Sequence, residues 1–141
     1  MATLGAYSLP YCYAAADGAR VLYLSEKIRK NQDQRLFETA SFVVGLFEDH
    51  AFAEGGKAYD LILKTRLRHA VVRYFTLKSE WNTDWGLPVN QEDMAGTNLA
   101  FSLIVLNGLE KFGFSISLRE KSAWLHAWKY IGYLLGIDDT F

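Results

Sequence analysis

The chain has 141 residues, half of them hydrophobic, and 15 Lys and Arg side chains nearly balance 16 Asp and Glu side chains. This length is typical of one domain with a substantial core, so we predict a single domain over residues 1–141. A net charge of −1 offers no basic surface to nucleic acid, and we expect no such partner. A single cysteine, Cys12, excludes a disulfide framework and a cysteine-rich zinc site.

No stretch resembles a membrane span or an export signal. The uncharged run at residues 94–109 is shorter than the ~20 apolar residues that cross a bilayer. Residues 1–17 contain no Lys or Arg and therefore lack the basic region that begins a secretory signal. We expect a cytoplasmic protein with no membrane span.

The first part of the chain predicts a lead-in followed by two helices. Residues 1–17 are typical of an irregular or lightly helical segment. Apolar residues at helical spacing predict a helix over 19–30. A second helix is expected to begin at Asp33, as its N-cap, and to continue to about Phe47.

The middle of the chain predicts one long helix and one loop. Residues 57–78 have apolar positions at three- and four-residue steps and no helix breaker. The centre of this segment is unusually basic. Residues 79–89, with Trp81, Trp85 and Pro88, are rich in turn formers and predict a loop.

Two capping signals define the last helices. Asn90 is followed by Asp93 at the third helical position, which predicts a helix from Asn90 to about Phe112. Ser117 and Glu120 form the S-x-x-E pattern of a capping box, and Gly136 is the expected end of that helix. No segment alternates with period two, so we predict an all-α protein with about five main helices.

The most informative candidate residues lie in the helix over 57–78. Arg66, His69 and Arg73 are spaced three and four apart and project from one face. Two neighbouring guanidinium groups disfavour the imidazolium and leave a neutral nitrogen available to bind a metal. The same arginines could hold carboxylates such as the propionates of a haem. The alternative is that both arginines pair with acidic residues and that His69 is structural.

A second polar face is predicted on the preceding helix, where Arg35, Glu38 and Thr39 lie at i, i+3 and i+4. One interpretation is a solvated stripe with an Arg35–Glu38 pair, which would contribute little to stability. The other is that this face meets the face of His69 and that the pocket between them holds a flat cofactor.

The remaining candidates have structural interpretations by default. Cys12 has no basic neighbour that would lower its pKa, so we expect it to be buried and not reactive. His50 lies beside two acidic residues, where a solvated cluster is favoured over a metal site. His126 is expected to have a hydrogen-bonded core role and is the rival candidate for an axial ligand.

Two segments resemble the MpaB/rubber oxygenase family. They are residues 66–73, which read RLRHAVVR, and residues 88–102, which read PVNQEDMAGTNLAFS. Residues 35–39, RLFET, also fit the family pattern, and the resemblance extends from about Ala19 to Ile137.

The resemblance implies a globin-like helical core around a haem b. It implies His69 as the proximal ligand of the iron, Arg66 and Arg73 as the flanking arginines, and Arg35 and Thr39 as polar residues on the distal side. Rubber-cleaving members use dioxygen to cleave carbon–carbon double bonds. The resemblance therefore implies a haem-dependent oxygenase that acts with dioxygen on a small hydrophobic, unsaturated substrate.

The sequence departs from the family pattern at three points. Glu38 stands where rubber-cleaving members have a lysine that can occupy the sixth coordination site. Ala19 stands where they have a distal glutamate proposed as base, so Glu38 is the candidate for that role. The chain is also shorter, which favours either an open haem site or a homo-oligomer whose second copy covers apolar surface.

Two other functions are compatible with these residues. The first is a non-enzymatic haem-binding or O₂/redox-sensing protein, because a fold and a ligand do not determine the chemistry. The second is a helical interaction domain without a cofactor, in which Arg66 and His69 are structural.

Overall fold

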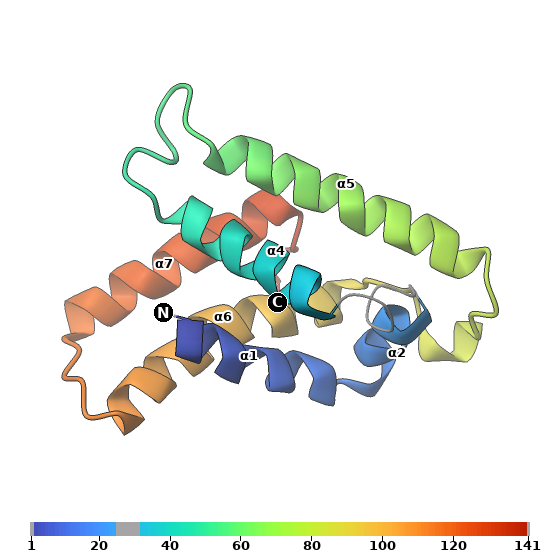
Figure 1. Cartoon of the computed structure of the whole chain (residues 1–141), viewed down its shortest axis with the longest axis horizontal. Helices are drawn as coiled ribbons and strands as arrows, with labels where there is room; N and C mark the ends of the chain where they lie inside the picture. The colour runs from blue at the N-terminus through green and yellow to red at the C-terminus, as the bar shows by residue number, and fades with distance from the viewer. Residues whose placement is uncertain (1, 25–31, 141) are drawn as a thin grey trace. The chain divides into compact units, whose positions relative to one another are not determined.

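The computed structural model describes residues 2–24 and 32–140, and its regular structure over these ranges is helical, with no strand (Figure 1). The prediction of an all-α protein is confirmed. The chain divides into two compact units. The first contains the residues up to Ala19 and those from Asn90 onward, and the second contains Arg20–Val89.

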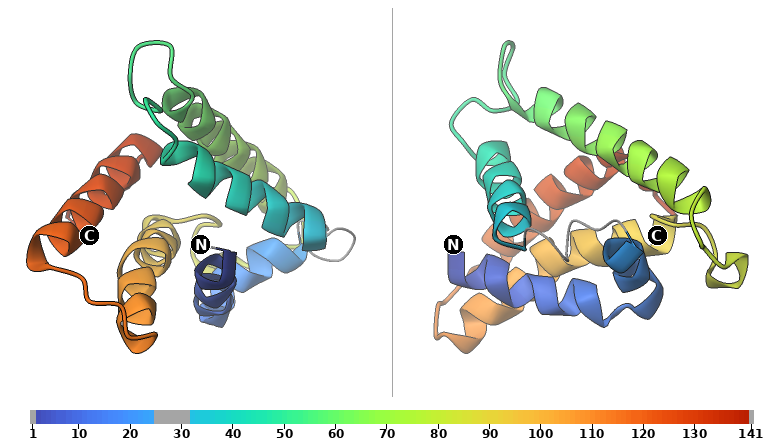
Figure 2. Two further views of the ribbon diagram at one scale, coloured as in Figure 1. Left: turned by 60° about the vertical axis from the view of Figure 1, so that its left-hand side comes forward. Right: turned by 45° about the vertical axis from the view of Figure 1, so that its right-hand side comes forward.

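The first unit is built on helices α1 (Ala2–Ala14), α6 (Gln91–Lys111) and α7 (Leu118–Leu135). Helix α1 packs along α6, and α6 packs against α7 (Figure 2). The prediction of an irregular or lightly helical lead-in was wrong for residues 2–14, which form a full helix. This segment is apolar on most sides and contains Pro10, so it lacks the amphipathic pattern that marks a surface helix.

The pairing of α6 with α7 provides the core of the first unit. The rings of Phe101 and Trp128 stack with centroids 5.9 Å apart, and Trp124 lies edge-on to Trp128 at 6.0 Å. The indole N–H of Trp124 donates to the backbone oxygen of Ser102 at 3.0 Å. Ile131 is completely buried in this core. Stacked aromatic rings bury a large apolar area, so this contact stabilises the helix pair.

The capping predictions for these helices are confirmed. The Asn90 side chain accepts from the backbone N–H of Asp93 at 2.8 Å. Ser117 and Glu120 form a complete capping box at the start of α7. Gly136 ends α7 in the left-handed conformation, with φ of 89°.

Helix α2 (Ala16–Leu24) begins three residues before the predicted start at Ala19, and the predicted continuation over 25–30 lies outside the described residues. The second unit then contains α4 (Gln32–Leu46), α5 (Ala58–Leu77) and the short 3₁₀ helix η1 (Thr83–Trp85). The long helix predicted over 57–78 is confirmed to within one residue at each end. Asp33 lies inside α4, so the prediction that it is the N-cap was wrong.

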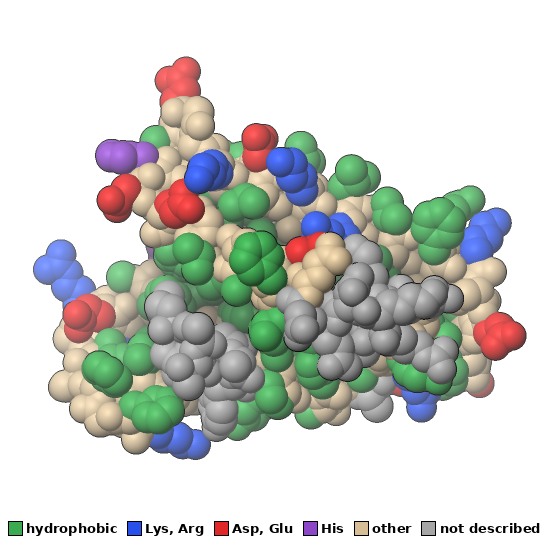
Figure 3. Space-filling model, viewed as in Figure 1, with side chains coloured by type: hydrophobic (Ala, Val, Ile, Leu, Met, Phe, Trp, Pro, Cys, Tyr) green, Lys and Arg blue, Asp and Glu red, His purple; other side chains and the backbone are tan. Residues whose placement is uncertain are grey.

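Helices α4 and α5 pack against each other in antiparallel directions. Gly45 of α4 faces Leu61 of α5, and Glu38 of α4 faces Arg68 of α5. A Cβ atom at position 45 would lie 2.7 Å from Cδ1 of Leu61, so a larger residue there would displace the end of the Leu61 side chain. Apolar side chains also reach the surface among charged ones (Figure 3), and on α5 they include Leu63 and Leu67.

Candidate functional site

His69 lies in the middle of the most buried stripe of α5. The stripe contains Ala58, Ile62 and Thr76, which are buried, together with half-buried residues between them. His69 is half-buried, and its Nδ1 atom is completely shielded from solvent. A metal-ligating histidine binds through one ring nitrogen and normally donates its other N–H to a nearby acceptor. Because Nδ1 is shielded from solvent, Nε2 is the nitrogen to consider as a ligand atom.

Arg73, one turn after His69, is engaged by the loop that precedes α6. Its Nη2 donates to the backbone oxygen of Val89 at 2.6 Å, and its Nε donates to that of Pro88 at 3.2 Å. Arg73 is half-buried, and Pro88 is almost completely buried. The guanidinium group therefore binds the loop to α5 through two backbone carbonyls. The spacing of the basic residues did not reveal this role.

Arg66, one turn before His69, is exposed. The three residues predicted to share one face therefore lie in three environments: Arg66 at the surface, His69 half-buried, and Arg73 bonded to a loop. Helical spacing brings side chains to one side of a helix, but the packing of neighbouring segments decides which of them reach solvent.

The polar residues predicted on α4 are partly described. Glu38 forms an ion pair with Nη1 of Arg68 at 3.2 Å and accepts a hydrogen bond from Gln34 at 3.1 Å. Thr39 is half-buried. Arg35 lies in the described backbone of α4, and the placement of its side chain is outside the description. One interpretation of the sequence pairs Glu38 with Arg35 of the same helix. The ion-pair partner that the structure describes, Arg68, lies on the neighbouring helix α5.

The antiparallel register brings the two predicted polar segments to the same level. Glu38 pairs with Arg68, so His69, the next residue of α5, lies level with Phe37 and Glu38 of α4. The ion pair is partly exposed, with 52% of the Arg68 and 29% of the Glu38 side chain accessible. Such a pair contributes at most about 1 kcal/mol to stability, so its main effect is to orient these two side chains.

The family-like motif that begins at Pro88 organises the start of α6. Asn90 caps the helix, and Gln91 donates to the backbone oxygen of Gly136 at 3.0 Å and accepts from the N–H of Asp138 at 2.9 Å. The Asp93 carboxylate lies against Gly18, where a Cβ atom would be 3.1 Å from Oδ1. Burial raises the pKa of Asp93, although the hydrogen bond from Asn90 opposes the shift. Asn90 therefore caps the start of α6, and Gln91 joins that start to the end of α7.

The other predicted candidates have varied surroundings. His126 is exposed, so the expected core role was wrong, because α7 turns Trp128, Ile131 and Gly132 inward instead. His50 is exposed in the loop after α4 with a φ of 59°. Cys12 is half-buried. Within residues 2–24 and 32–140, no three His, Cys, Asp or Glu side chains gather as a metal site would require.

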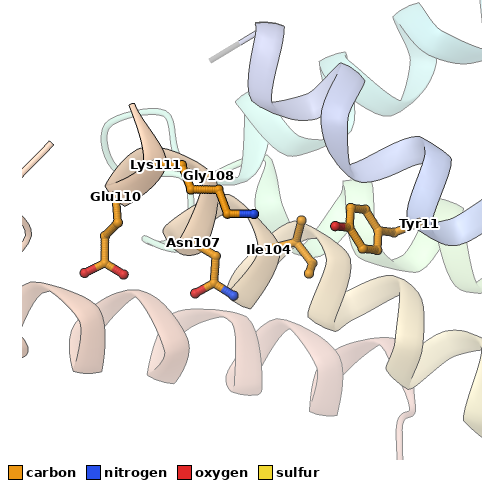
Figure 4. A pocket seen from close by; sticks show the side chains of 6 residues that line it. All are labelled: Tyr11, Ile104, Asn107, Gly108, Glu110 and Lys111. Atoms are coloured by element: carbon orange, nitrogen blue, oxygen red, sulfur yellow. The ribbon is translucent and has the colours of Figure 1, made fainter. Parts of the chain in front are cut away.

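A surface pocket lies in the first unit. It has a volume of about 410 Å³ and lies between α1, which contributes Tyr11, and α6, which contributes Ile104, Asn107, Gly108, Glu110 and Lys111 (Figure 4). The Glu110 carboxylate that borders it is paired with Lys121 of α7. None of the residues predicted for the site lines this pocket.

None of the described helices is long and apolar enough to cross a membrane.

Comparison with known proteins places these elements in a family. The family model for the ER-bound oxygenase mpaB/B'/rubber oxygenase catalytic domain matches residues 14–140. A rubber oxygenase of Streptomyces sp. (strain K30) is 25% identical over 127 residues, which are 87% of this chain and 31% of that protein. The chain thus spans about a third of the length of this curated relative. No solved structure matches the chain. Because the family model covers nearly the whole sequence, the chain belongs to the mpaB/rubber oxygenase catalytic-domain family.

Proposed function

We propose that the chain is a haem b-dependent oxygenase domain that acts with dioxygen on a small hydrophobic, unsaturated substrate. The observation that carries the proposal is the position of His69. It lies at the centre of α5 with Nδ1 buried, in the segment whose sequence resembles the family. Family membership supports oxygenase chemistry, and the name of the Streptomyces relative supports an unsaturated hydrocarbon as substrate.

The residues present are compatible with a haem. A metal held by side chains alone needs several ligands, which the described residues do not gather. A haem iron takes four nitrogens from the porphyrin and needs one histidine from the protein. Since Nδ1 of His69 is buried, we assign Nε2 as the ligand atom. Haem b supplies the iron that activates dioxygen toward a carbon–carbon double bond.

The other proposed roles concern the two sides of the cofactor. Arg66 and Arg73 would hold the carboxylates of the haem, because a guanidinium group can bind a carboxylate through two hydrogen bonds. Arg35 and Thr39 would supply the polar groups near bound dioxygen, and that polarity would decide whether dioxygen is held or activated. Glu38 is the candidate base, and Arg68 orients its carboxylate.

The first experiment is an absorption spectrum of the whole chain, as purified and after addition of haemin. The spectrum is recorded oxidised, reduced with dithionite and treated with CO, and a pyridine haemochrome assay identifies the haem. We expect a Soret band, a b-type haemochrome and a CO shift. His69→Ala should abolish the band or change the iron's ligation, whereas His126→Ala, the matched control at an exposed histidine, should not.

Two results would contradict this assignment. Absence of a Soret band after addition of haemin would leave the family relationship as one of fold alone. An unchanged spectrum in His69→Ala would remove His69 as the ligand. If haem binds, dioxygen consumption and carbonyl products are then measured with a polyisoprene emulsion, and the absence of turnover would favour the haem-binding or sensing alternative.

A further inference from the structure

We propose that Arg73 is a positioning residue, which holds the loop before α6 in a strained turn one helical turn from His69. This role in the loop is independent of the proposed function.

The first observation is the geometry of the Arg73 guanidinium group. Nε and Nη2 donate to the backbone oxygens of two successive residues, Pro88 and Val89, at 3.2 and 2.6 Å. Successive carbonyls of an extended chain point to opposite sides, so one side chain does not reach both. The chain has to turn at Val89 for the two oxygens to converge on one guanidinium group.

The second observation is the backbone conformation of Val89. Its φ is 56°, in the left-handed region. A β-branched residue at positive φ is a genuine outlier, because its Cβ is crowded against the backbone. Such strain persists only where the surrounding structure determines the conformation. The charge-assisted hydrogen bonds from Arg73 supply that constraint.

The rest of the loop is held by its own contacts. The indole N–H of Trp81 donates to the backbone oxygen of Gly86 at 2.9 Å, and its ring lies edge-on to Trp85 at 5.2 Å. The guanidinium of Arg20 stacks on Trp85 at 4.1 Å from the ring centroid. Pro88 is almost completely buried. These contacts give the loop its own structure. Arg73, a side chain of α5, connects that loop to the helix through two hydrogen bonds.

The hydrogen bonds to the loop use one edge of the Arg73 guanidinium group. A guanidinium has five N–H donors in a fixed fork, and Arg73 directs Nε and Nη2 of that fork toward the loop. Because the fork is rigid and meets two acceptors at once, it determines the orientation of the loop as well as its distance from α5. The geometry thus assigns loop positioning to Arg73.

The test uses the cofactor-free whole chain labelled with 5-fluorotryptophan. Trp81 and Trp85 lie in the loop, and Trp124 and Trp128 lie in α7, so the four ¹⁹F resonances report both regions. We expect Arg73→Gln to shift the resonances of Trp81 and Trp85 and leave the other two in place. Arg68→Gln, on the same helix and paired with Glu38, is the matched control and should leave all four unshifted.

A double-mutant cycle tests the link to the strained turn. Arg73→Gln should lower the folded-to-unfolded ratio about tenfold in urea titrations, as expected for a lost charge-assisted hydrogen bond. In a Val89→Gly background, a positive φ at position 89 is unstrained. There, Arg73→Gln should lower the folded-to-unfolded ratio only roughly threefold or less. Leu87→Gly, a neighbouring exposed residue, should not reduce the loss. If Arg73→Gln does not fold, Arg73→Lys, which keeps the charge but not the fork, replaces it.

Two results would overturn the positioning role. One is a set of unshifted Trp81 and Trp85 resonances in Arg73→Gln, and the other is a loss of stability that stays about tenfold in the Val89→Gly background. If the wild-type chain binds no haemin, the proposed function fails, and the fluorine spectra and the cycle still decide the role of Arg73 in the loop.

Discussion

Asp93 illustrates how a neighbouring helix changes the properties of a single side chain. Its Oδ2 atom is buried without a hydrogen-bond partner among the described residues, and Gly18 lies against its Oδ1. Desolvation raises the pKa of Asp93, and the nearby charges of Asp17 and Glu92 raise it further. An acidic group near a helix N-terminus is normally favourable. Here burial dominates, so the ionised form of Asp93 lowers the stability of the fold.

We therefore predict that Asp93→Asn increases stability in a pH-dependent way. Since the pKa is higher in the folded than in the unfolded chain, stability falls as pH rises from about 3.9, the ordinary aspartate pKa, through the raised value. The free-energy difference between variant and wild type should grow over that window and level off above it. Urea unfolding at a series of pH values measures it, and a difference that does not vary with pH would contradict the prediction.

At the scale of single helices, the boundaries follow from local capping chemistry. Asn90 accepts from the N–H of Asp93, and Ser117 exchanges hydrogen bonds with Glu120. The hydrogen bonds of Ser117 hold the pKa of the Glu120 carboxyl below its usual range. The partners lie within three residues of each other, so the sequence contains the whole interaction. Helix α1 has no such cap in its sequence, and its helical conformation depends on packing along α6.

The cap at Asn90 provides a prediction about α6. Asn90→Ala should lower the free energy of unfolding by about 1 kcal/mol, because an N–H at the helix start loses its acceptor. Asn107→Ala, an exposed position within the same helix, is the matched control and should not lower stability, because alanine has the higher helix propensity. Chemical denaturation of both variants measures the difference. Equal effects of the two substitutions would show that the cap contributes nothing specific.

At the scale of the whole molecule, the chain contains two compact units, each with its own buried residues. Ile131 and Trp128 are buried in the first unit, and Leu46 and Ile62 are buried in the second. We predict from the length of the chain that it nevertheless behaves as one domain. In that case, the two sets of buried side chains stabilise one cooperative folding transition.

Substitution in each core tests this prediction. Ile131→Ala and Ile62→Ala should each lower stability by about 2–5 kcal/mol, because each leaves a cavity in a packed interior. We expect both variants to shift a single common transition in urea, followed by circular dichroism and by hydrogen exchange. If Ile62→Ala unfolds α5 while amides of α6 and α7 keep their protection, the units are separate folding domains.

The candidate site was predictable only in part. The spacing of Arg66, His69 and Arg73 correctly indicated a basic segment on one helix, because that spacing is a local property. It did not reveal that Arg73 bonds to a loop 15 and 16 residues further on, or that Glu38 pairs with Arg68. These partners depend on how the chain returns to α5. The positive φ of Val89 also has no sequence signal, since valine normally avoids that conformation.

The sequence by itself determined the helical class, the capped starts of α6 and α7, the extent of α5 and the family, since each depends on residues close together in the chain or on a pattern along it. The tertiary structure decided that residues 2–14 are helical, that His126 is exposed, and that Nδ1 of His69 is buried. The physical reason is that burial and hydrogen-bond partners depend on distant segments. Helix propensity and residue spacing depend only on residues that are close together in the sequence.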